Sequence, residues 1–322
     1  MISTEAIRKQ LGNVLEETAF EGLGELQRGK VRDSYLQGDK RIIVVSDRIS
    51  AFDCVLGTIP FKGQVLNQLA AFWFDKSRDV APNHMISMPD PNAMIVRECE
   101  QLPLEFVVRG YITGVTKTSA WYNYERGVRN LCGNPLPEGL RKDQKLARPI
   151  ITPTTKHEKH DRNISRDEAL AEGLIDAATF DKAADICLRL YTRAVEHAAS
   201  RGLIFVDTKY ELGKLNGDLV VSDEINTPDS SRYWFTDTYA ARFAAGEDQR
   251  KLDKEYVRQW LADQGFRGDG TPPALTDEVR IEAARRYIEA YEIVTGQTFQ
   301  VDAADRRPIA ERVGRALGAR GL

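Results

Sequence analysis

Strand-like and helix-like segments follow one another along this chain without a regular alternation. Apolar runs and period-two patterns predict strands over residues 29–37, 41–46 and 105–114. Apolar side chains at helical spacing predict helices over residues 1–20, 65–78, 179–200, 251–263 and 277–294. A doubly wound parallel sheet requires a helix after nearly every strand. The order of these segments therefore favours an α+β fold.

Two further stretches carry weaker patterns. Residues 121–165 are rich in glycine, proline and charged side chains and show little periodicity, which predicts a long functional loop. Residues 305–322 are strongly basic and predict a solvated helix. The chain has 322 residues, 42% of them hydrophobic, so it has enough apolar side chains for one large or two ordinary domains.

Charge and composition exclude several classes of protein. The formal net charge of -3 comes from closely mixed acids and bases, so no long-range field favours nucleic acid or an anionic membrane. No stretch reaches the ~18 apolar residues of a spanning helix, and the charged N-terminal segment lacks the apolar core of a signal peptide. The four cysteines form no C-x-x-C pair. We expect a cytoplasmic enzyme or binding protein, as a monomer or a homo-oligomer.

The stretch VDTKYELG, residues 206–213, alternates charged with uncharged side chains. Because side chains alternate faces along a strand, Asp207, Lys209 and Glu211 are expected on one face. The opposite face would then hold Val206, Thr208, Tyr210 and Leu212. This pattern concentrates charge on one side of the strand.

The segment KLNGDL predicts a hairpin after this strand. A three-residue loop, residues 216–218, pairs Leu215 with Leu219 and sets Glu211 opposite Asp223. Two opposed carboxylates destabilise a strand pair unless a cation lies between them, and Mg²⁺ takes carboxylate oxygens together with substrate phosphates. A two-residue turn would send Asp223 to the other face and remove this argument. An exposed hairpin with solvated charges is the alternative.

The next polar cluster, DEINTPDSSRYW, contains a proline turn. In this turn Asp229, Ser230 and Arg232 place a carboxylate, a hydroxyl and a planar guanidinium side by side. A guanidinium matches the geometry of a carboxylate or a phosphate. The cluster therefore predicts contacts with an anionic ligand.

A basic segment, GKVRD, follows a glycine turn near the N-terminus. Gly24 to Lys30 spells G-x-x-x-x-G-K, but Val31 replaces the required hydroxyl and no strand precedes the glycine, so this is not a P-loop. The turn at Gly29 instead leads into a strand on which Lys30 and Arg32 share a face and hold the phosphates of a nucleotide. A solvated basic strand is an equal alternative.

Two polar positions follow apolar strands. The motif SDRISAFD comes after IIVV, so Ser50 and Asp53 lie at a strand end, where either a binding site or a plain turn is expected. Arg109 follows a buried apolar run in VVRGYITG. A buried arginine requires a salt bridge or a ligand, and both explanations stay open for Arg109.

The segment TPTTKHEKHD contains Lys156, His160 and Asp161. A zinc site is disfavoured because no third ligand lies near its two histidines, and contacts with substrate are the alternative. The sequence also lacks G-x-S-x-G, H-E-x-x-H, H-R-D and D-F-G motifs. Covalent hydrolysis and protein phosphorylation are therefore disfavoured.

Taken together and in this order, the motifs resemble the SAICAR synthetase family, the phosphoribosylaminoimidazole-succinocarboxamide synthases of de novo purine synthesis. The resemblance is carried by GKVRD, SDRISAFD, KGQVLNQLAAFWF, VVRGYITG, TPTTKHEKHD, DTKYELG and DEINTPDSSRYW. It implies an ATP-grasp-like α+β fold with the nucleotide cleft between two lobes, which we expect at residues 1–115 and 116–322, the second ending in helices. It also implies an ATP-dependent ligation of L-aspartate and carboxyaminoimidazole ribotide (CAIR) to SAICAR, ADP and phosphate.

The resemblance assigns roles to the candidate residues. Those implied to contact ATP or Mg²⁺ are Gly29, Lys30, Arg32, Glu211 and Asp223, the last two as metal ligands. Those implied to take part in catalysis are Lys209, near the transferring phosphate, with Asp207 and Lys156. Those implied to bind substrate are Ser50, Asp53, Arg109, His160, Asp161, Asp229, Ser230 and Arg232.

One position departs from the family pattern. Many members continue GYITG with serine, whereas Val115 follows Gly114 in this chain. The hydroxyl of Thr116, Thr118 or Ser119 would then replace the contact that this serine makes in other members, and the choice among the three stays open at this point.

The chemistry of amide formation agrees with this set of residues. A carboxylate is a poor electrophile, so ATP would first convert it into an acyl phosphate, which the amine of aspartate attacks. Such a site requires cations around the migrating phosphoryl group and fixed positions for two anionic substrates. A small-molecule kinase and a non-catalytic nucleotide-binding module are the alternatives, and ADP release that depends on aspartate separates the three.

Overall fold

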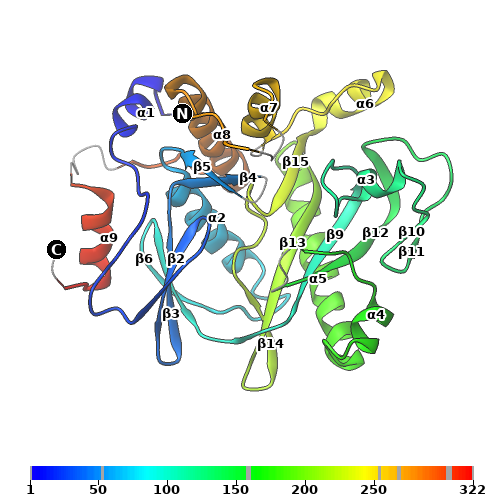
Figure 1. The fold of residues 1–322 in the computed structure, drawn as a ribbon, viewed down its shortest axis with the longest axis horizontal. Coiled ribbons are helices and arrows are strands. Elements are labelled where there is room, and N and C mark those ends of the chain that lie inside the picture. The colour runs from blue at the N-terminus through cyan, green and yellow to red at the C-terminus, as the bar shows by residue number, and fades with distance from the viewer. Residues whose placement is uncertain are drawn as a thin grey trace.

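The computed structural model describes residues 2–51, 54–156, 161–252, 255–266, 270–301 and 307–320. These residues form a mixed α/β fold of two lobes, each containing one main antiparallel sheet (Figure 1). The antiparallel pairing agrees with the predicted α+β class. None of the helices in these ranges is long and apolar enough to span a membrane.

The first lobe contains a five-stranded sheet in the order β1-β2-β3-β7-β6. Its central strands match the predicted ones, and a two-residue turn joins β2 to β3. A separate two-stranded ribbon, β4 and β5, follows β3. The strands are β1 (Glu25–Arg28), β2 (Arg32–Gln37), β3 (Lys40–Val45), β4 (Arg48–Ala51), β5 (Cys54–Thr58), β6 (Met85–Asp90) and β7 (Ala93–Arg97).

The second lobe contains a six-stranded sheet in which β13 is central, since it pairs with β8, β9, β14 and β15. β8 and β9 precede residue 115 and still belong to this sheet, and the division of the chain at that residue stays a prediction. Its strands are β8 (Glu100–Gln101), β9 (Leu104–Ile112), β12 (Gln144–Thr155), β13 (Leu203–Leu215), β14 (Asp218–Ser222) and β15 (Ser231–Phe235). A small hairpin comprises β10 (Asn130–Leu131) and β11 (Asn134–Pro135).

Helices cover the sheets and join the lobes through one hydrophobic core. Helix α5 packs on β13 and β9, whereas α8 packs on α1, α2 and α7 (Figure 1). The main core cluster extends from Trp73 of α2 to Phe205 of β13. The helices are α1 (Thr4–Gln10), α2 (Lys62–Lys76), α3 (Ala120–Tyr124), α4 (Arg166–Ala171), α5 (Ala177–Ser200), α6 (Thr236–Ala245), α7 (Glu255–Asp263), α8 (Asp277–Thr295) and α9 (Ile309–Leu317).

The ends of α5 and α8 follow from local sequence. The side chain of Asp176 accepts a hydrogen bond from the backbone of Thr179 and caps α5, and Gly202, with φ of +71°, follows its last turn. Thr276 caps α8 in the same way. The predicted helices over residues 179–200 and 277–294 are therefore confirmed.

Three expectations from the sequence are wrong. The N-terminal helix ends at Gln10, where residues 1–20 were expected to be helical. The stretch 121–165, expected to be an irregular loop, contains α3, β10, β11 and the long edge strand β12. The C-terminal helix α9 is not simply solvated, since Ile309 and Val313 are buried in a second core cluster and Arg312 pairs with Asp90 at 2.9 Å.

Asp47 of the SDRISAFD motif has a structural role. Its buried carboxylate accepts hydrogen bonds from the backbone N–H groups of Leu15 and Gly63, both at 2.8 Å. These bonds tie the N-terminal segment and the start of α2 to the end of β3. This polar residue at the strand end therefore helps to hold the fold together.

We expect the stability difference between the wild type and Asp47→Asn to depend on pH. Burial raises the pKa of Asp47 from 3.8 to about 6. The fold therefore favours the protonated carboxyl, and this contribution to stability is complete below pH ~4 and is lost as the pH rises through about 6. Between pH ~4 and ~7, the free energy of unfolding in urea should fall by up to about 3 kcal/mol more for the wild type than for the variant. Parallel profiles would contradict this, and Asp39→Asn at an exposed turn is the control.

Candidate functional site

Strand β13 carries the charged row, Asp207, Lys209 and Glu211, that was predicted from VDTKYELG. Asp207 and Lys209 form salt bridges of 3.5 and 3.2 Å with Arg109 and Glu105, two residues of β9 that share a face. Glu211 also contacts the ammonium group of Lys209. Asp207, Lys209 and Glu211 therefore lie on one face of the sheet, as predicted.

A bulge in β13 immediately before Asp207 interrupts the alternation. Val206 consequently packs with Tyr111 and Trp234, whereas Tyr210 joins the main core. The prediction that Val206 and Tyr210 share a face is therefore wrong. The charged row itself is unaffected because it begins after the bulge.

The turn between β13 and β14 has two residues, Asn216 and Gly217, where three were expected. Their φ values of 53° and 86° are typical of a type I′ turn, for which Asn-Gly is the favoured sequence. Glu211 therefore pairs with Ser222, and the predicted pairing with Asp223 is wrong. The Asn-Gly pair is the signal in the sequence that favours the shorter turn.

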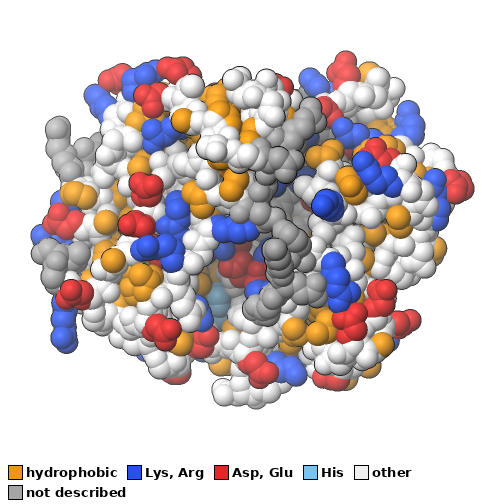
Figure 2. Space-filling model, viewed as in Figure 1, with side chains coloured by type: hydrophobic (Ala, Val, Ile, Leu, Met, Phe, Trp, Pro, Cys, Tyr) orange, Lys and Arg blue, Asp and Glu red, His pale blue; other side chains and the backbone are white. Residues whose placement is uncertain are grey.

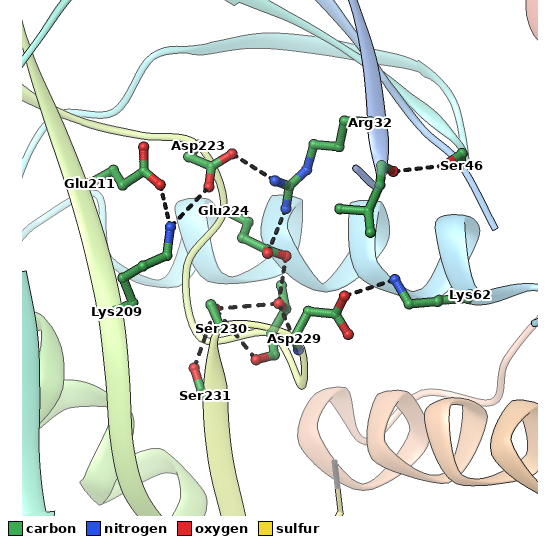
Figure 3. A network of polar contacts seen from close by, with 12 residues as sticks. Arg32, Ser46, Lys62, Lys209, Glu211, Asp223, Glu224, Asp229, Ser230 and Ser231 are labelled. Carbon is green, nitrogen blue, oxygen red and sulfur yellow. Dashed lines mark hydrogen bonds and ion pairs between the residues drawn. The ribbon is translucent and has the colours of Figure 1, made fainter. Parts of the chain in front are cut away.

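Asp223 nevertheless reaches the same group of charges. It follows β14 with a left-handed φ of 57°, which ends the strand alternation. Its carboxylate lies 2.9 Å from Arg32 and 3.7 Å from the ammonium group of Lys209 (Figure 3). Lys209 thus bridges the carboxylates of Glu211 and Asp223.

The pKa values of the two carboxylates are shifted in opposite directions. Burial would raise the pKa of Glu211, but the ammonium groups of Lys209 and Lys156 hold it below the usual range. Burial raises the pKa of Asp223 to about 6, in spite of the guanidinium of Arg32. A further cation beside Asp223 would favour its ionised form. Among the described parts of the chain, no three His, Cys, Asp or Glu side chains are grouped to hold a metal ion, so a metal here would need ligands from water or substrate.

Lys30 lies in the turn between β1 and β2, so the prediction that it shares a strand face with Arg32 is wrong. The N–H of Gly29 donates to the carbonyl of Arg32 at 2.8 Å and closes the turn. Buried Arg48 donates to the carbonyl oxygens of Gly29 and Lys30, both at 3.0 Å, and pairs with Asp33 at 2.7 Å. Arg48 therefore fixes the backbone of the turn that carries Lys30.

Other predicted residues lie at the edges of this group or outside the described residues. Lys156 contacts Glu211, so it belongs to the same charge cluster. Ser50 is half-buried on β4, and Asp161 is exposed after β12. The predicted residues outside the described ranges are Asp53 and His160.

Arg109 and Arg232 converge on Asp207 from β9 and β15, the strands on either side of β13. Their guanidinium nitrogens lie 3.5 and 2.6 Å from the same carboxylate oxygen of Asp207. Buried Arg109 also donates to the hydroxyl of Thr152 at 2.7 Å. The salt bridge expected as one explanation for Arg109 is therefore present, and two cations share one carboxylate.

The loop after β9 brings a hydroxyl group to Arg232. A Cβ atom added to Gly114 would lie 2.5 Å from the Oγ of Ser119 and 3.1 Å from an Nη of Arg232, so these two atoms approach the same point. The hydroxyl of Thr116 lies 2.7 Å from the Oγ of Ser119. Thr118 instead directs its carbonyl oxygen to the other arginine of the pair. The hydroxyl of Ser119 therefore lies near Arg232, with the hydroxyl of Thr116 in contact with it.

The turn TPDSSR is anchored by two helices. Asp229 accepts a hydrogen bond from the Nζ of Lys62 in α2 at 2.8 Å (Figure 3). It accepts a second one from the hydroxyl of Tyr287 in α8 at 2.6 Å. The side chain of Lys62 is fully buried. Sequence reasoning missed both partners, since Lys62 stands in a motif otherwise dominated by apolar residues and Tyr287 lies in a helix without a local signal.

A cavity of about 130 Å³ lies beside this turn. Its lining residues are Asp207, Pro228, Asp229, Ser230, Ser231, Arg232 and Arg258. Arg258 comes from α7 and was not identified from the sequence, where it is one of several charged residues on an amphipathic helix. Acidic and basic side chains also gather in the hollow between the two halves of the molecule (Figure 2).

The sequence is similar to a known family over most of its length. A family model described as SAICAR synthetase matches residues 25–273. The phosphoribosylaminoimidazole-succinocarboxamide synthase of Legionella pneumophila (strain Lens) is 46% identical over 301 residues, which cover 93% of this chain and 96% of that protein. The enzyme of the same name from Cytophaga hutchinsonii is 49% identical over 294 residues, with coverage of 89% and 94%.

Solved structures agree with the sequence comparison. SAICAR synthase from Saccharomyces cerevisiae, complexed with SAICAR, superimposes with a TM-score of 0.77 at 31% identity, covering 89% of this chain and 100% of that one. A SAICAR synthetase in complex with ADP gives a TM-score of 0.66 at 26% identity, covering 86% and 100%. The match to the family model, the identity to its members and the shared fold together establish that this chain belongs to the SAICAR synthetase family.

Proposed function

We propose that this chain uses ATP to join L-aspartate to CAIR, giving SAICAR, ADP and phosphate, in de novo purine biosynthesis. Membership of the SAICAR synthetase family supports this activity, as do the solved relatives that hold SAICAR or ADP. Within the chain, the strongest support is the geometry around Lys209. There β13 and the residues after β14 bring two carboxylates to one ammonium group, and Arg32 of β2 lies beside them.

The reaction proceeds through an acyl phosphate. The carboxylate of CAIR attacks the γ-phosphorus of ATP, and ADP leaves as the bond to the bridging oxygen breaks. The amine of L-aspartate then attacks the acyl carbon, phosphate leaves, and the nitrogen loses a proton as the amide forms. Lys209, with Lys156 beside it, holds positive charge at the migrating phosphoryl group, and Asp207 fixes the arginines next to it.

Glu211 and Asp223 fit a magnesium ion. Both provide hard carboxylate oxygens, and they stand on either side of a site that already accommodates the cationic group of Lys209. Mg²⁺ is commonly bound by one or two carboxylates together with water and substrate phosphates. When bound, the ion would neutralise negative charge on the phosphate groups. Glu211 and Asp223 would hold it, while Lys209 keeps its salt bridge with Glu105.

We assign the remaining residues to contacts either with the nucleotide or with the ribotide. Gly29, Lys30 and Arg32 form the turn and strand that contact the phosphates of ATP, and Arg48 keeps that turn in shape. The groups that bind CAIR are Arg109, Arg232 and Ser119, with Ser119 as the hydroxyl that replaces the serine of other members. The other residues of the substrate cleft are Ser50, Asp53, His160, Asp161, Asp229 and Ser230.

This arrangement corresponds to an ATP-grasp-like fold in which the nucleotide lies between the lobes. The phosphate-binding turn belongs to the sheet of the first lobe, and the acidic strand β13 belongs to that of the second. The proposed division of the chain near residue 115 does not separate the two sheets, because β8 and β9, which precede it, pair within the sheet of the second lobe. Contacts such as the salt bridge of Arg32 with Asp223 join the two sides.

Release of ADP that depends on aspartate tests the proposed function. With MgATP and CAIR, the purified protein should release ADP only when L-aspartate is present, and the succinylated product should appear in equal amount by mass spectrometry. Omission of Mg²⁺ should abolish the reaction. Release of ADP without aspartate, with a stable phosphorylated product, would instead identify a small-molecule kinase. Absence of release under all conditions would refute catalysis.

A further inference from the structure

Glu224 joins the arginine of the first lobe to the second lobe. The two terminal nitrogens of Arg32, on β2, contact different carboxylates, since Nη1 lies 2.9 Å from Asp223 and Nη2 lies 2.5 Å from Glu224. Both acids follow β14. The side chain of Glu224 is buried, so solvent screens its ion pair only weakly. A phosphate that replaces Asp223 at one nitrogen therefore leaves Glu224 in contact with the other.

The second oxygen of Glu224 is bonded to the turn that carries Asp229 and Ser230. This oxygen accepts a hydrogen bond of 2.5 Å from the buried hydroxyl of Thr227. The same hydroxyl accepts a hydrogen bond from the N–H of Asp229 at 3.3 Å, and the carbonyl of Thr227 accepts one from the N–H of Ser230 at 3.2 Å. Figure 3 shows Glu224 between Arg32 and this turn. Two side chains, those of Glu224 and Thr227, thus connect the guanidinium of Arg32 to the backbone of the turn.

The chain between Glu224 and Thr227 is fixed by the core. Asn226 has a left-handed backbone, with φ of 56°. Its side-chain oxygen accepts a hydrogen bond of 2.8 Å from the hydroxyl of Tyr210, and its backbone carbonyl accepts one of 2.5 Å from the hydroxyl of Tyr233. Both tyrosines are buried. A displacement of Glu224 is therefore passed on to Thr227, because the chain between them cannot adjust independently.

We propose that Glu224 and Thr227 are positioning residues that couple the binding of the nucleotide to the binding of the ribotide. The proposal rests on the proposed function, in which Arg32 contacts ATP and the turn of Asp229 contacts CAIR. When phosphates hold Arg32, Glu224 and Thr227 have fewer alternative positions, so the turn is ordered before the ribotide binds. The second ligand then removes less conformational freedom, and each ligand raises the affinity for the other.

Isothermal titration calorimetry of the full-length protein tests this coupling. In a buffer with Mg²⁺, saturating ADP should lower the Kd of the wild type for CAIR by about fivefold or more. CAIR should lower the Kd for ADP by the same factor, because coupling between two sites is reciprocal. In Thr227→Val, which removes the hydroxyl but keeps a similar shape, this factor should fall below about twofold, whereas the Kd of each ligand alone should stay within about threefold of the wild-type value.

Thr295→Val is the matched control. The hydroxyl of Thr295 is also buried, donates to the carbonyl of Tyr291 at 2.7 Å and accepts from the N–H of Gln297 at 3.1 Å, but it lies at the end of α8. This variant loses the same kind of hydroxyl and should keep the wild-type coupling factor. Thr227→Ser should also keep it, since serine restores the hydroxyl. A purely structural role of Thr227 would lower the unfolding temperature without a change in this factor.

The outcomes separate this inference from the proposed function. A wild-type protein that binds ADP and CAIR independently, or a Thr227→Val variant that keeps the wild-type factor, would overturn the inference. If thermal unfolding shows that Thr227→Val does not fold, Glu224→Gln replaces it, because the loss of charge weakens the contact with Arg32 and should also lower the factor. An unchanged factor in Glu224→Gln would overturn the inference as well. A wild-type protein that binds neither ligand would mean that the proposed function itself had failed.

Discussion

Replacement of Glu211 by glutamine is expected to lower kcat by about 10²–10³-fold. The carboxylate lies against the ammonium groups of Lys156 and Lys209, and these cations keep its pKa below the usual range. Glutamine keeps the shape and one acceptor oxygen but removes the charge that would hold Mg²⁺ and orient Lys209. The concentration of Mg²⁺ that gives half-maximal turnover should therefore also increase. Initial rates of ADP release over a series of Mg²⁺ concentrations measure both effects.

Glu98→Gln provides the control for this experiment. Glu98 is likewise an ion-paired glutamate, but its partner at 2.7 Å is Arg41 of β3. Its variant should keep wild-type kcat and the wild-type requirement for Mg²⁺. Near-wild-type turnover in Glu211→Gln would defeat the assignment of Glu211 as a metal ligand. Thermal unfolding of both variants distinguishes a loss of catalysis from a loss of structure.

Replacement of Arg232 by methionine is expected to raise the KM for CAIR by about 10²-fold, because a guanidinium that matches an anionic group of the ribotide is removed. Asp207 retains its salt bridge with Arg109, so the sheet should remain folded. The KM for ATP should stay within about twofold, since the nucleotide residues lie on β2 and the turn before it. Steady-state kinetics with each substrate varied in turn give these constants.

Arg250→Met is the matched control for Arg232. The side chain of Arg250 is 48% exposed and lies over the ring of Phe235, at the end of β15. The variant loses the same charge near the same strand without a change in the cluster around Asp207. An equal rise in the KM for CAIR in both variants would indicate a general electrostatic effect and would contradict a direct contact of Arg232 with the ribotide.

The sequence predicted those elements whose signals are local. Helix α5 has its cap at Asp176 and its glycine at position 202, so both ends could be predicted within two residues. The long strand β12 was missed because Pro149 and Pro153 argue against a strand, yet prolines are tolerated on an edge strand such as this one. The predicted N-terminal helix stops early because the N–H groups of Leu15 and Thr18 bond to Asp47 and Asp33 instead.

The residues of the candidate site likewise include some that local sequence predicts and some that it does not. Alternation along a single strand was enough to place Asp207, Lys209 and Glu211 on one face. Asp223 was assigned to the correct cluster by an incorrect register, since its left-handed backbone, and not the hairpin pairing, brings it to Lys209. Residues such as Arg258 could not be predicted, because a helix approaches the site only through tertiary packing and leaves no local pattern in the sequence.

The salt bridges of the site join residues that lie far apart along the chain. Arg32 and Asp223 are separated by 191 positions, Lys62 and Asp229 by 167. Contacts of such long range form late, since much of the intervening chain must be ordered before their ends meet. A nascent chain that has completed the first sheet therefore still lacks the acidic partners of its basic residues. The site consequently comes into being only after most of the polypeptide has been made and folded, and enzymatic activity marks the completion of folding.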